Sequence, residues 1–245
     1  MIVPRQNMQN KDKTNFVKCD DCSMNSVCQP LETLKQSINL SESYLHKRVS
    51  TKANNVLFKQ STPLKNIYAV SSGIFKLCQQ MNGCADNIIG LRFPGELIGE
   101  DALFLKNYNY TAVAVSDSSV CSVSVEQITS CGQLVPEVQQ NLIELLSRQS
   151  YVRQRNFQAY IGKKSADSLL AAFILNIIER NASYTGSNNS IELPINRNDI
   201  ANFLGLRRET LSRVFSKFQK EQLIQVEGKK IVLLAQEKLI KLANF

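Results

Sequence analysis

Short runs of apolar and β-branched residues, separated by turn signals, dominate the chain between residues 56 and 125. The runs read "NIYAVSSGIFKLCQQ", "NIIGLRF" and "TAVAVSDSSVCSVSV", with Ser-Gly, Asn-Gly and Pro-Gly pairs within or between them. Runs of this length, bounded by glycine and proline, are typical of strands joined by tight turns. This region therefore predicts an antiparallel β-roll or barrel.

The pair Asn82-Gly83 is the sharpest turn signal in this region. Asn-Gly favours a two-residue hairpin turn, which would pair Met81 with Cys84 and Cys78 with Asn87. In that register Cys78 and Cys84 do not face each other, so we expect no disulfide between them.

After Pro136 the apolar spacing lengthens to that of a helix. Alternating steps of four and three residues define a seam, predicted to be the contact between two copies of the chain: Val138, Leu142, Leu145, Gln149, Val152, Asn156 and Ala159. Two polar positions in the seam predict a weak, switchable dimer. Two alternatives remain open: a helix packed on its own β-roll, and a competing register through Leu146, Arg153 and Phe157.

The C-terminal third predicts a winged helix-turn-helix. The apolar helix "ADSLLAAFILNIIERN" and the loop "ASYTGSNNS" precede the stretch "NRNDIANFLGLRRETLSRVFSKFQKEQLIQVEGKKIVLL". We expect a short helix ending near Leu204, a turn at Gly205, a helix from about Arg207 to Lys220, and a hairpin around Glu227-Gly228.

The second of these helices has one apolar and one polar face. The apolar face consists of Leu211, Val214, Phe215 and Phe218, and the polar face of Arg208, Glu209, Ser212, Arg213 and Ser216. Arginine can donate two hydrogen bonds to guanine, glutamate accepts from cytosine, and serine serves either edge, so the polar face suits double-stranded DNA. Phosphates are expected to meet Arg207, Lys217, Lys229 and Lys230. An ordinary surface helix with a Glu209–Arg213 pair is the alternative.

Charge and composition support this interpretation. The 245-residue chain carries a net charge of +8, and residues 163 to 245 hold 13 Lys and Arg against 8 Asp and Glu, a net +5. A basic domain permits a polyanionic partner. The chain has neither a signal-peptide pattern nor a long apolar run, so we expect a cytoplasmic protein without membrane contact.

Three cysteines stand close together in a polar N-terminal arm, "CDDCSMNSVCQP". Cys19, Cys22 and Cys28 are separated by two and five residues. Closely spaced thiols in a reducing compartment favour a metal site over disulfides. The Cys-x-x-Cys pair alone leaves structural zinc and a thiol redox pair open. An enzyme is not expected, because the single histidine, His46, provides no Cys-His nucleophile pair.

Taken together, these stretches resemble the CRP/FNR superfamily of bacterial transcription regulators, and most closely its FNR (fumarate and nitrate reduction) branch. The resemblance rests on "IYAVSSGIFKL", "FPGELIGEDALF", "DIANFLGLRRETLSR" and the cysteine arm, and covers nearly the whole chain. It implies an α+β fold: a β-roll of the cyclic-nucleotide-binding jelly-roll type, a long dimerisation helix and a winged helix-turn-helix. The implied domains are 1–30 (cysteine arm), 31–131 (β-roll), 132–161 (dimerisation helix) and 162–245 (DNA binding).

The resemblance also implies a mechanism. In that branch, three arm cysteines and one β-roll cysteine hold a 4Fe-4S cluster, which would be Cys19, Cys22, Cys28 and Cys121 here. The intact cluster favours the homodimer that binds DNA, oxygen converts it to 2Fe-2S and then removes it, and the bound dimer contacts RNA polymerase through β-roll loops such as 82–90. The alternative is a constitutive or zinc-stabilised regulator of the same fold. Ser23 and Val27, next to ligands, are candidates for tuning cluster stability.

The sequence departs from the family pattern at three places. The cyclic-AMP branch has an Arg-Ser pair where this chain has Tyr110 and Thr111, so no cyclic nucleotide is expected. Glu209, Ser212 and Arg213 match the pattern for a TTGAT half-site, but Arg208 resembles the cyclic-AMP branch, which prefers TGTGA. We therefore expect a TTGAT palindrome to be bound, with a relaxed or hybrid preference at the base that Arg208 reaches. Gln154 stands in the dimer helix where an acidic residue is expected.

Overall fold

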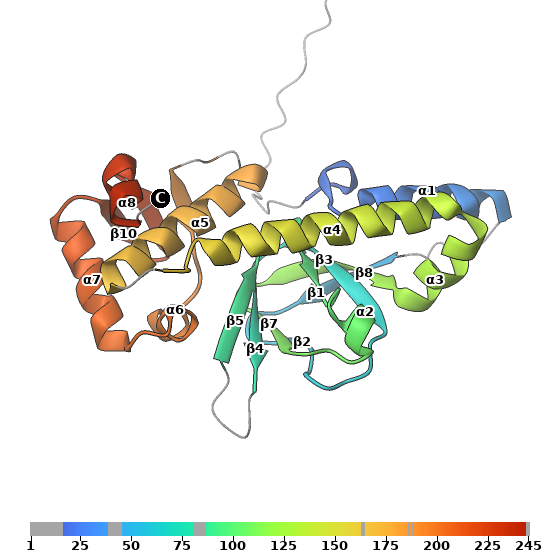
Figure 1. Cartoon of the computed structure of the whole chain (residues 1–245), viewed down its shortest axis with the longest axis horizontal. Helices are drawn as coiled ribbons and strands as arrows, with labels where there is room; N and C mark the ends of the chain where they lie inside the picture. The colour runs from blue at the N-terminus through green and yellow to red at the C-terminus, as the bar shows by residue number, and fades with distance from the viewer. Residues whose placement is uncertain are drawn as a thin grey trace, which may run out of the picture.

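The structure is a computed structural model that describes residues 17–38, 46–80, 87–162, 165–185, 187 and 189–243. Figure 1 shows one long helix, α4 (Pro136–Gln158), running across the top of a β-roll. The N-terminal helix α1 (Asn25–Ile38) lies along one end of α4, and the C-terminal helices gather at the other. Within these residues, no helix is both long and apolar enough to cross a membrane.

The β-roll consists of two four-stranded antiparallel sheets, ordered β1-β8-β3-β6 and β2-β7-β4-β5. Between them lies a cluster that includes Tyr68, Phe75 and Val120, each at most 8% exposed. The predicted β-roll is confirmed. Its strands are β1 (His46–Thr51), β2 (Val56–Phe58), β3 (Asn66–Ser72), β4 (Phe75–Gln79), β5 (Asn87–Arg92), β6 (Leu97–Ile98), β7 (Thr111–Ala114) and β8 (Ser118–Ser124).

The predicted pairing of Cys78 with Asn87 is wrong by one residue. Cys78 pairs with Ile88 and Gln79 with Asn87, and the register shifts between Leu77 and Cys78. Cys78 and Ile88 are both buried, whereas Asn87 is exposed. A one-residue slip would place apolar side chains on the solvent face, so burial sets the register. The Asn82-Gly83 turn lies outside the described residues.

The predicted seam of α4 faces its own chain, with three of its residues buried and the other four half-buried. Val138 and Leu145 are 0% and 5% exposed, and they pack with Met24 of the arm and Val123 of β8. The prediction that this register faces a second copy is therefore wrong, because the β-roll and the arm already cover it. The opposite face of α4 carries apolar side chains more than half exposed: Ile143, Tyr151 and Phe157.

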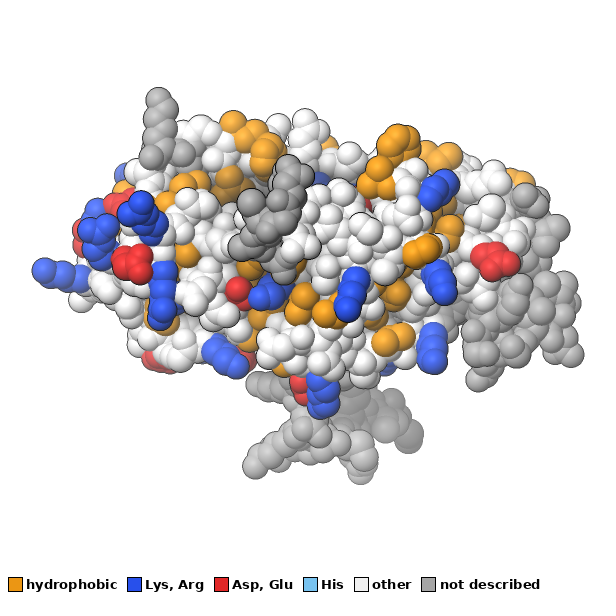
Figure 2. Space-filling model, turned by 90° about the horizontal axis from the view of Figure 1, so that it is seen from below, with side chains coloured by type: hydrophobic (Ala, Val, Ile, Leu, Met, Phe, Trp, Pro, Cys, Tyr) orange, Lys and Arg blue, Asp and Glu red, His pale blue; other side chains and the backbone are white. Residues whose placement is uncertain are grey.

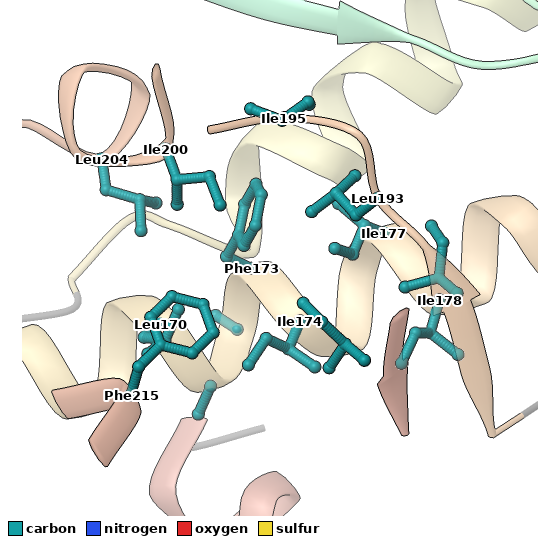
Figure 3. Packing of buried hydrophobic residues seen from close by; sticks show 14 of the residues in the cluster. Leu170, Phe173, Ile174, Ile177, Ile178, Leu193, Ile195, Ile200, Leu204 and Phe215 are labelled. Atoms are coloured by element: carbon teal, nitrogen blue, oxygen red, sulfur yellow. The ribbon is translucent and has the colours of Figure 1, made fainter. Parts of the chain in front are cut away.

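The C-terminal domain is built around α5 (Ala166–Thr185), whose side chains are buried on nearly every side. Figure 3 shows Phe173, Ile174 and Ile177 of α5 surrounded by side chains from the neighbouring elements. The remaining elements are β9 (Ser190–Glu192), α6 (Arg197–Leu204), α7 (Arg208–Lys220), β10 (Ile224–Glu227), β11 (Lys230–Leu233) and α8 (Gln236–Ala243). Strands β10 and β11 form the predicted hairpin, with β9 beside β11.

A largely buried ion pair joins this domain to the β-roll. Arg180 of α5 donates from Nε to Oε1 of Glu96 at 2.8 Å and from Nη2 to Oε2 at 2.7 Å. The two side chains are 13% and 15% exposed. Burial by itself raises the pKa of Glu96, but the charge and hydrogen bonds of Arg180 outweigh it and hold that pKa below its usual 4.5. The pair is thus ionised at neutral pH.

Glu96→Gln is expected to lower the free energy of unfolding at pH 7 by about 3 kcal/mol, because it removes the negative charge that faces Arg180 and leaves only one of the two oxygen acceptors. The lowered pKa means that the pair stabilises the fold fully above pH 4.5 and loses this contribution as pH falls further. Urea unfolding of both proteins should therefore show a difference that narrows in acid. Lys52→Met, which breaks the exposed Lys52–Asp117 pair, is the control and should change stability little. A Glu96→Gln protein as stable as the original would show that the ion pair contributes nothing.

Candidate functional site

The cysteine arm is fixed to the β-roll by residues between its cysteines. A single 3-10 turn, η1 (Cys19–Asp21), lets the Cys22 N–H donate to the Cys19 carbonyl at 3.1 Å. Met24 and Val27 are 1% and 0% exposed and enter the apolar cluster beneath α4. Ser23 Oγ donates to the Gly95 carbonyl oxygen at 2.5 Å. Ser23 and Val27 therefore anchor the arm.

Three of the four predicted ligands converge on that same cluster. Cys22 and Cys28 from the arm and Cys121 from β8 are half-buried and pack against it, while Cys19 is exposed. Cys121 lies in the middle of its sheet, paired with Arg48 of β1 and Ala69 of β3. Residues almost a hundred positions apart in sequence are thus brought to one apolar surface.

The pKa of Cys22 depends in part on two of the other three cysteines. Burial raises the pKa of the Cys22 thiol, and the neighbouring Cys121 and Cys19 raise it further, while a backbone hydrogen bond at Met24 lowers it. In the part of the chain that the structure describes, no three Cys, His, Asp or Glu side chains are close enough together to hold a metal ion. The donor set nevertheless fits an iron-sulfur cluster chemically, since thiolates are its usual ligands. Cys19, Cys22, Cys28 and Cys121 would hold it.

The helix-turn-helix has the predicted geometry. Helix α6 begins with an Asn196 cap, whose side chain accepts the Asp199 N–H at 2.8 Å. It ends at Leu204 and is followed by the cap residue Gly205, which has φ of +65° in the left-handed region. Helix α7 then buries the four predicted apolar residues Leu211, Val214, Phe215 and Phe218. Glycine adopts the left-handed backbone conformation found at Gly205 at the least cost.

The opposite face of α7 is open to solvent. Arg208, Glu209 and Arg213 are exposed and Ser212 is half-buried. Arg213 Nη2 lies 3.4 Å from Thr210 Oγ1, and among the described residues it forms no ion pair with Glu209, so the pairing expected of an ordinary surface helix is not seen. Figure 2 shows Lys and Arg side chains at the end of the molecule that carries this domain, with Asp and Glu among them, and further Lys and Arg along the rest of this face.

The four cations expected to meet phosphates differ in their surroundings. Arg207, Lys229 and Lys230 are exposed, and the last two belong to the β10–β11 hairpin. Lys217 instead forms an ion pair with Asp167 of α5. This partner was not foreseen, because Asp167 lies 50 residues away and nothing in the local pattern points to it.

The place expected of the cyclic-nucleotide arginine is filled by a buried tyrosine. Tyr110 is 3% exposed, and its hydroxyl accepts the Gly99 N–H at 2.9 Å. Burial, followed by the charge of Glu100, raises its pKa well above the usual value, so the hydroxyl stays neutral. Thr111 Oγ1 accepts the Gln60 N–H. Neither residue offers a positive charge to a phosphate.

Comparison with known proteins adds two domain matches. Residues 48–133 match the family model of the cyclic nucleotide-binding domain, and residues 170–242 match that of the Crp-like helix-turn-helix domain. The first match concerns the domain type, and the position within it where a phosphate-binding arginine is expected holds Tyr110.

The chain is also similar over most of its length to proteins with curated names. It is 32% identical to the transcriptional activator protein FnrA of Stutzerimonas stutzeri over 226 residues, which is 92% of each chain. It is 30% identical to the fumarate and nitrate reduction regulatory protein of Escherichia coli K12, over 93% of this chain and 91% of that one. The solved structure of FixK2 from Bradyrhizobium japonicum has the same fold, with a TM-score of 0.70 at 22% identity, covering 81% of this chain and 97% of that one.

Gly205→Ala is expected to lower the free energy of unfolding by about 1 kcal/mol, because alanine pays a steric penalty in the left-handed region. A Cβ at this position would meet no atom within 4 Å, so the penalty comes from the backbone conformation rather than from crowding. Gly205→Asn, which tolerates this conformation better, should cost less in the same urea titration. Equal stability of all three proteins would show that α6 and α7 do not need this turn.

Proposed function

The chain belongs to the CRP/FNR family of transcription regulators, and from this premise we propose that it is an oxygen-responsive regulator whose dimer binds DNA when Cys19, Cys22, Cys28 and Cys121 hold a 4Fe-4S cluster. It is a DNA-binding transcription regulator and not an enzyme. The observation that carries the proposal is the convergence of Cys22, Cys28 and Cys121, from two distant parts of the chain, on one apolar cluster. The relatives named for fumarate and nitrate reduction support the anaerobic role.

When bound, the cluster would supply iron and sulfide that react with oxygen and so report its presence. The chain's own contribution is to hold the arm in place. Met24 and Val27 pack against Val138 and Leu145 of α4, and Asn141 Nδ2 of α4 donates to the Ser26 carbonyl at 2.7 Å. One side of helix α4 is therefore supported by the cysteine arm, which carries three of the proposed ligands. If the arm becomes disordered, α4 loses this support.

The exposed face of α4 offers a second copy its contact surface. Ile143 and Phe157 of α4 are each 66% exposed, and Ile161, in the turn that follows α4, is 58% exposed. They belong to a series with alternating steps of four and three residues, the spacing of a two-helix contact: Ile143, Ser147, Ser150, Gln154, Phe157 and Ile161. The polar residues among them predict a dimer of moderate strength, which suits a switch. This is the register that we propose in place of the buried seam.

In the proposed dimer, two α7 helices read half-sites about 34 Å apart. Arg208, Glu209, Ser212 and Arg213 contact base edges of a TTGAT-type palindrome, while Arg207, Lys229 and Lys230 contact phosphates. Splitting the dimer removes one helix and most of the affinity at once. The bound dimer would contact RNA polymerase through β-roll loops such as 82–90, of which residues 82–86 lie outside the described residues.

Anaerobic purification tests the cluster. The original protein should be brown, contain iron and acid-labile sulfide, and lose visible absorbance in air. Cys121→Ser should lack the cluster and bind the palindrome at least about 10²-fold more weakly, because it stays monomeric. Cys78→Ala, at a buried cysteine outside the ligand set, is the control and should keep both properties. A colourless protein with one zinc, or a Cys121→Ser protein that binds DNA as tightly as the original, would contradict the proposal.

The half-site preference tests the reading helix. Arg213→Ala should weaken binding by about 1 to 3 kcal/mol and relax specificity at one base, because a bidentate base contact is lost. Arg208→Val should shift the ratio of affinities for TTGAT and TGTGA half-sites, measured by fluorescence anisotropy at fixed salt. Lys238→Ala, at an exposed cation of α8, should leave that ratio unchanged. If Arg208→Val also leaves it unchanged, Arg208 contacts only the backbone of DNA.

A further inference from the structure

One turn of the β-roll touches both the cysteine arm and the DNA-binding domain. The turn consists of residues Phe93–Glu96, between β5 and β6. Its fold is held from within, because the Phe93 N–H donates to Glu96 Oε2 at 3.1 Å. It is also held to β3, since the Gly95 N–H donates to the Val70 carbonyl at 2.8 Å and the Val70 N–H to the Glu96 carbonyl at 2.9 Å. A turn fixed at so many points moves as a unit.

The arm contacts this turn at Gly95. Ser23, directly after Cys22, donates from its hydroxyl to the Gly95 carbonyl oxygen at 2.5 Å, across 72 residues of sequence. Gly95 has φ of +82°, a left-handed conformation, and its backbone is buried. Because the hydrogen bond comes from the residue next to a predicted ligand, the position of Cys22 and that of the turn are linked.

The DNA-binding domain contacts the same turn at the next residue. The Glu96 carboxylate receives both hydrogen bonds of the Arg180 pair, and the Arg180 guanidinium lies 4.6 Å from the centre of the Phe93 ring. Arg180 Nη2 also donates to the Leu91 carbonyl at 2.7 Å. The Arg180 guanidinium is thus held by the two carboxylate oxygens of Glu96, the Leu91 carbonyl and the Phe93 ring. These contacts fix both its position and the orientation of its plane.

From Arg180 the contacts continue to the dimerisation helix. Arg180 Nη1 donates to Asn176 Oδ1 at 3.3 Å, and Asn176 Nδ2 donates to Asn156 Oδ1 of α4 at 3.0 Å. Asn176 is only 6% exposed, so this link lies inside the protein. Arg180 thus stands between the turn and the helix that carries the proposed dimer contact.

Arg180 is also well placed to orient α7. It belongs to α5, which forms the core of the DNA-binding domain, and Phe173 and Leu170 of that helix pack with Ile200 and Leu204 of α6 and Phe215 of α7 (Figure 3). Close-packed interiors transmit displacement because they contain few voids. A shift at Arg180 therefore carries α6 and α7 with it.

We propose that the Phe93–Glu96 turn couples the cysteine arm to the DNA-binding domain. Ser23 fixes the Gly95 carbonyl, the turn thereby holds the Glu96 carboxylate against Arg180, and Arg180 sets the orientation of α7. Ser23, Glu96 and Arg180 are positioning residues that touch neither DNA nor the proposed cluster ligand atoms. The link to oxygen rests on the proposed function, whereas the coupling between Ser23 and Glu96 holds whether or not iron is bound.

A double-mutant cycle with Ser23→Ala and Glu96→Asp tests the coupling. Glu96→Asp keeps the negative charge, but its shorter side chain cannot reach both nitrogens of Arg180. Anaerobic proteins are compared for affinity to the palindrome by fluorescence anisotropy, for dimerisation by sedimentation, and for iron content. Ser26→Ala, at an exposed serine of the same arm, is the matched control.

Ser23→Ala is expected to weaken DNA binding about 5-fold or more, the usual size of coupling between sites, with dimerisation and iron content unchanged. In the Glu96→Asp background the same change should have little further effect, because the path is already broken. Ser26→Ala should not affect DNA binding. Additive effects of the two changes would overturn the proposal, and so would a loss of iron or of dimer in step with DNA affinity, since Ser23 would then act by another path. If the original protein contained no iron, the proposed cluster would be contradicted but the proposed coupling would not, because the double-mutant cycle is evaluated from DNA affinity.

Discussion

The buried pair of Glu96 and Arg180 constrains the relative position of the β-roll and the DNA-binding domain. Apolar packing between them, with Ile88 and Leu91 from β5 against α5 and α6, favours contact without fixing direction. A bidentate ion pair is directional, and separating it leaves two uncompensated buried charges. The DNA-binding domain can therefore rotate relative to the β-roll only if Glu96 and Arg180 each gain another partner in place of the one they lose. This condition helps to fix the position of α7, together with the Lys76–Asp199 ion pair and the hydrogen bond from the Ile88 N–H to Asn202, which join the β-roll to α6.

Helix α4 carries two apolar faces for two different tasks. Val138 and Leu145 are needed within one chain, to cover the arm and β8. Ile143 and Phe157, on the other face, remain more than half exposed, which is costly unless a partner covers them. Both faces belong to one rigid helix. A displacement of the arm on one side therefore also moves the exposed face on the other side. In the proposed function, this is a physical reason for the cysteine arm to lie beside the helix that carries the dimer contact.

Local signals allowed the helix-turn-helix to be predicted closely from the sequence. Gly205 and the apolar face of α7 are encoded within about twenty residues, and the structure has both where they were expected. The α4 register failed because a repeat of four and three shows which residues are apolar but not which surface covers them. The β4–β5 register failed for a similar reason, since the burial of Cys78 and Ile88 depends on α5 and α6 far along the chain. Glu96 and Arg180 are 84 residues apart, and neither stands in a motif that points to the other.

The apolar surroundings of the cysteines have a chemical consequence. Burial comes first among the causes that raise the pKa of Cys22, and nearby thiols add to it, so the arm by itself favours the protonated thiol. Ligation requires the thiolate, and a positively charged partner must therefore offset the cost of burying that charge. Met24 and Val27 are almost completely buried, and they hold Cys22 and Cys28 in these apolar surroundings. The same packing that positions Cys22 therefore makes its ionisation depend on a positively charged partner.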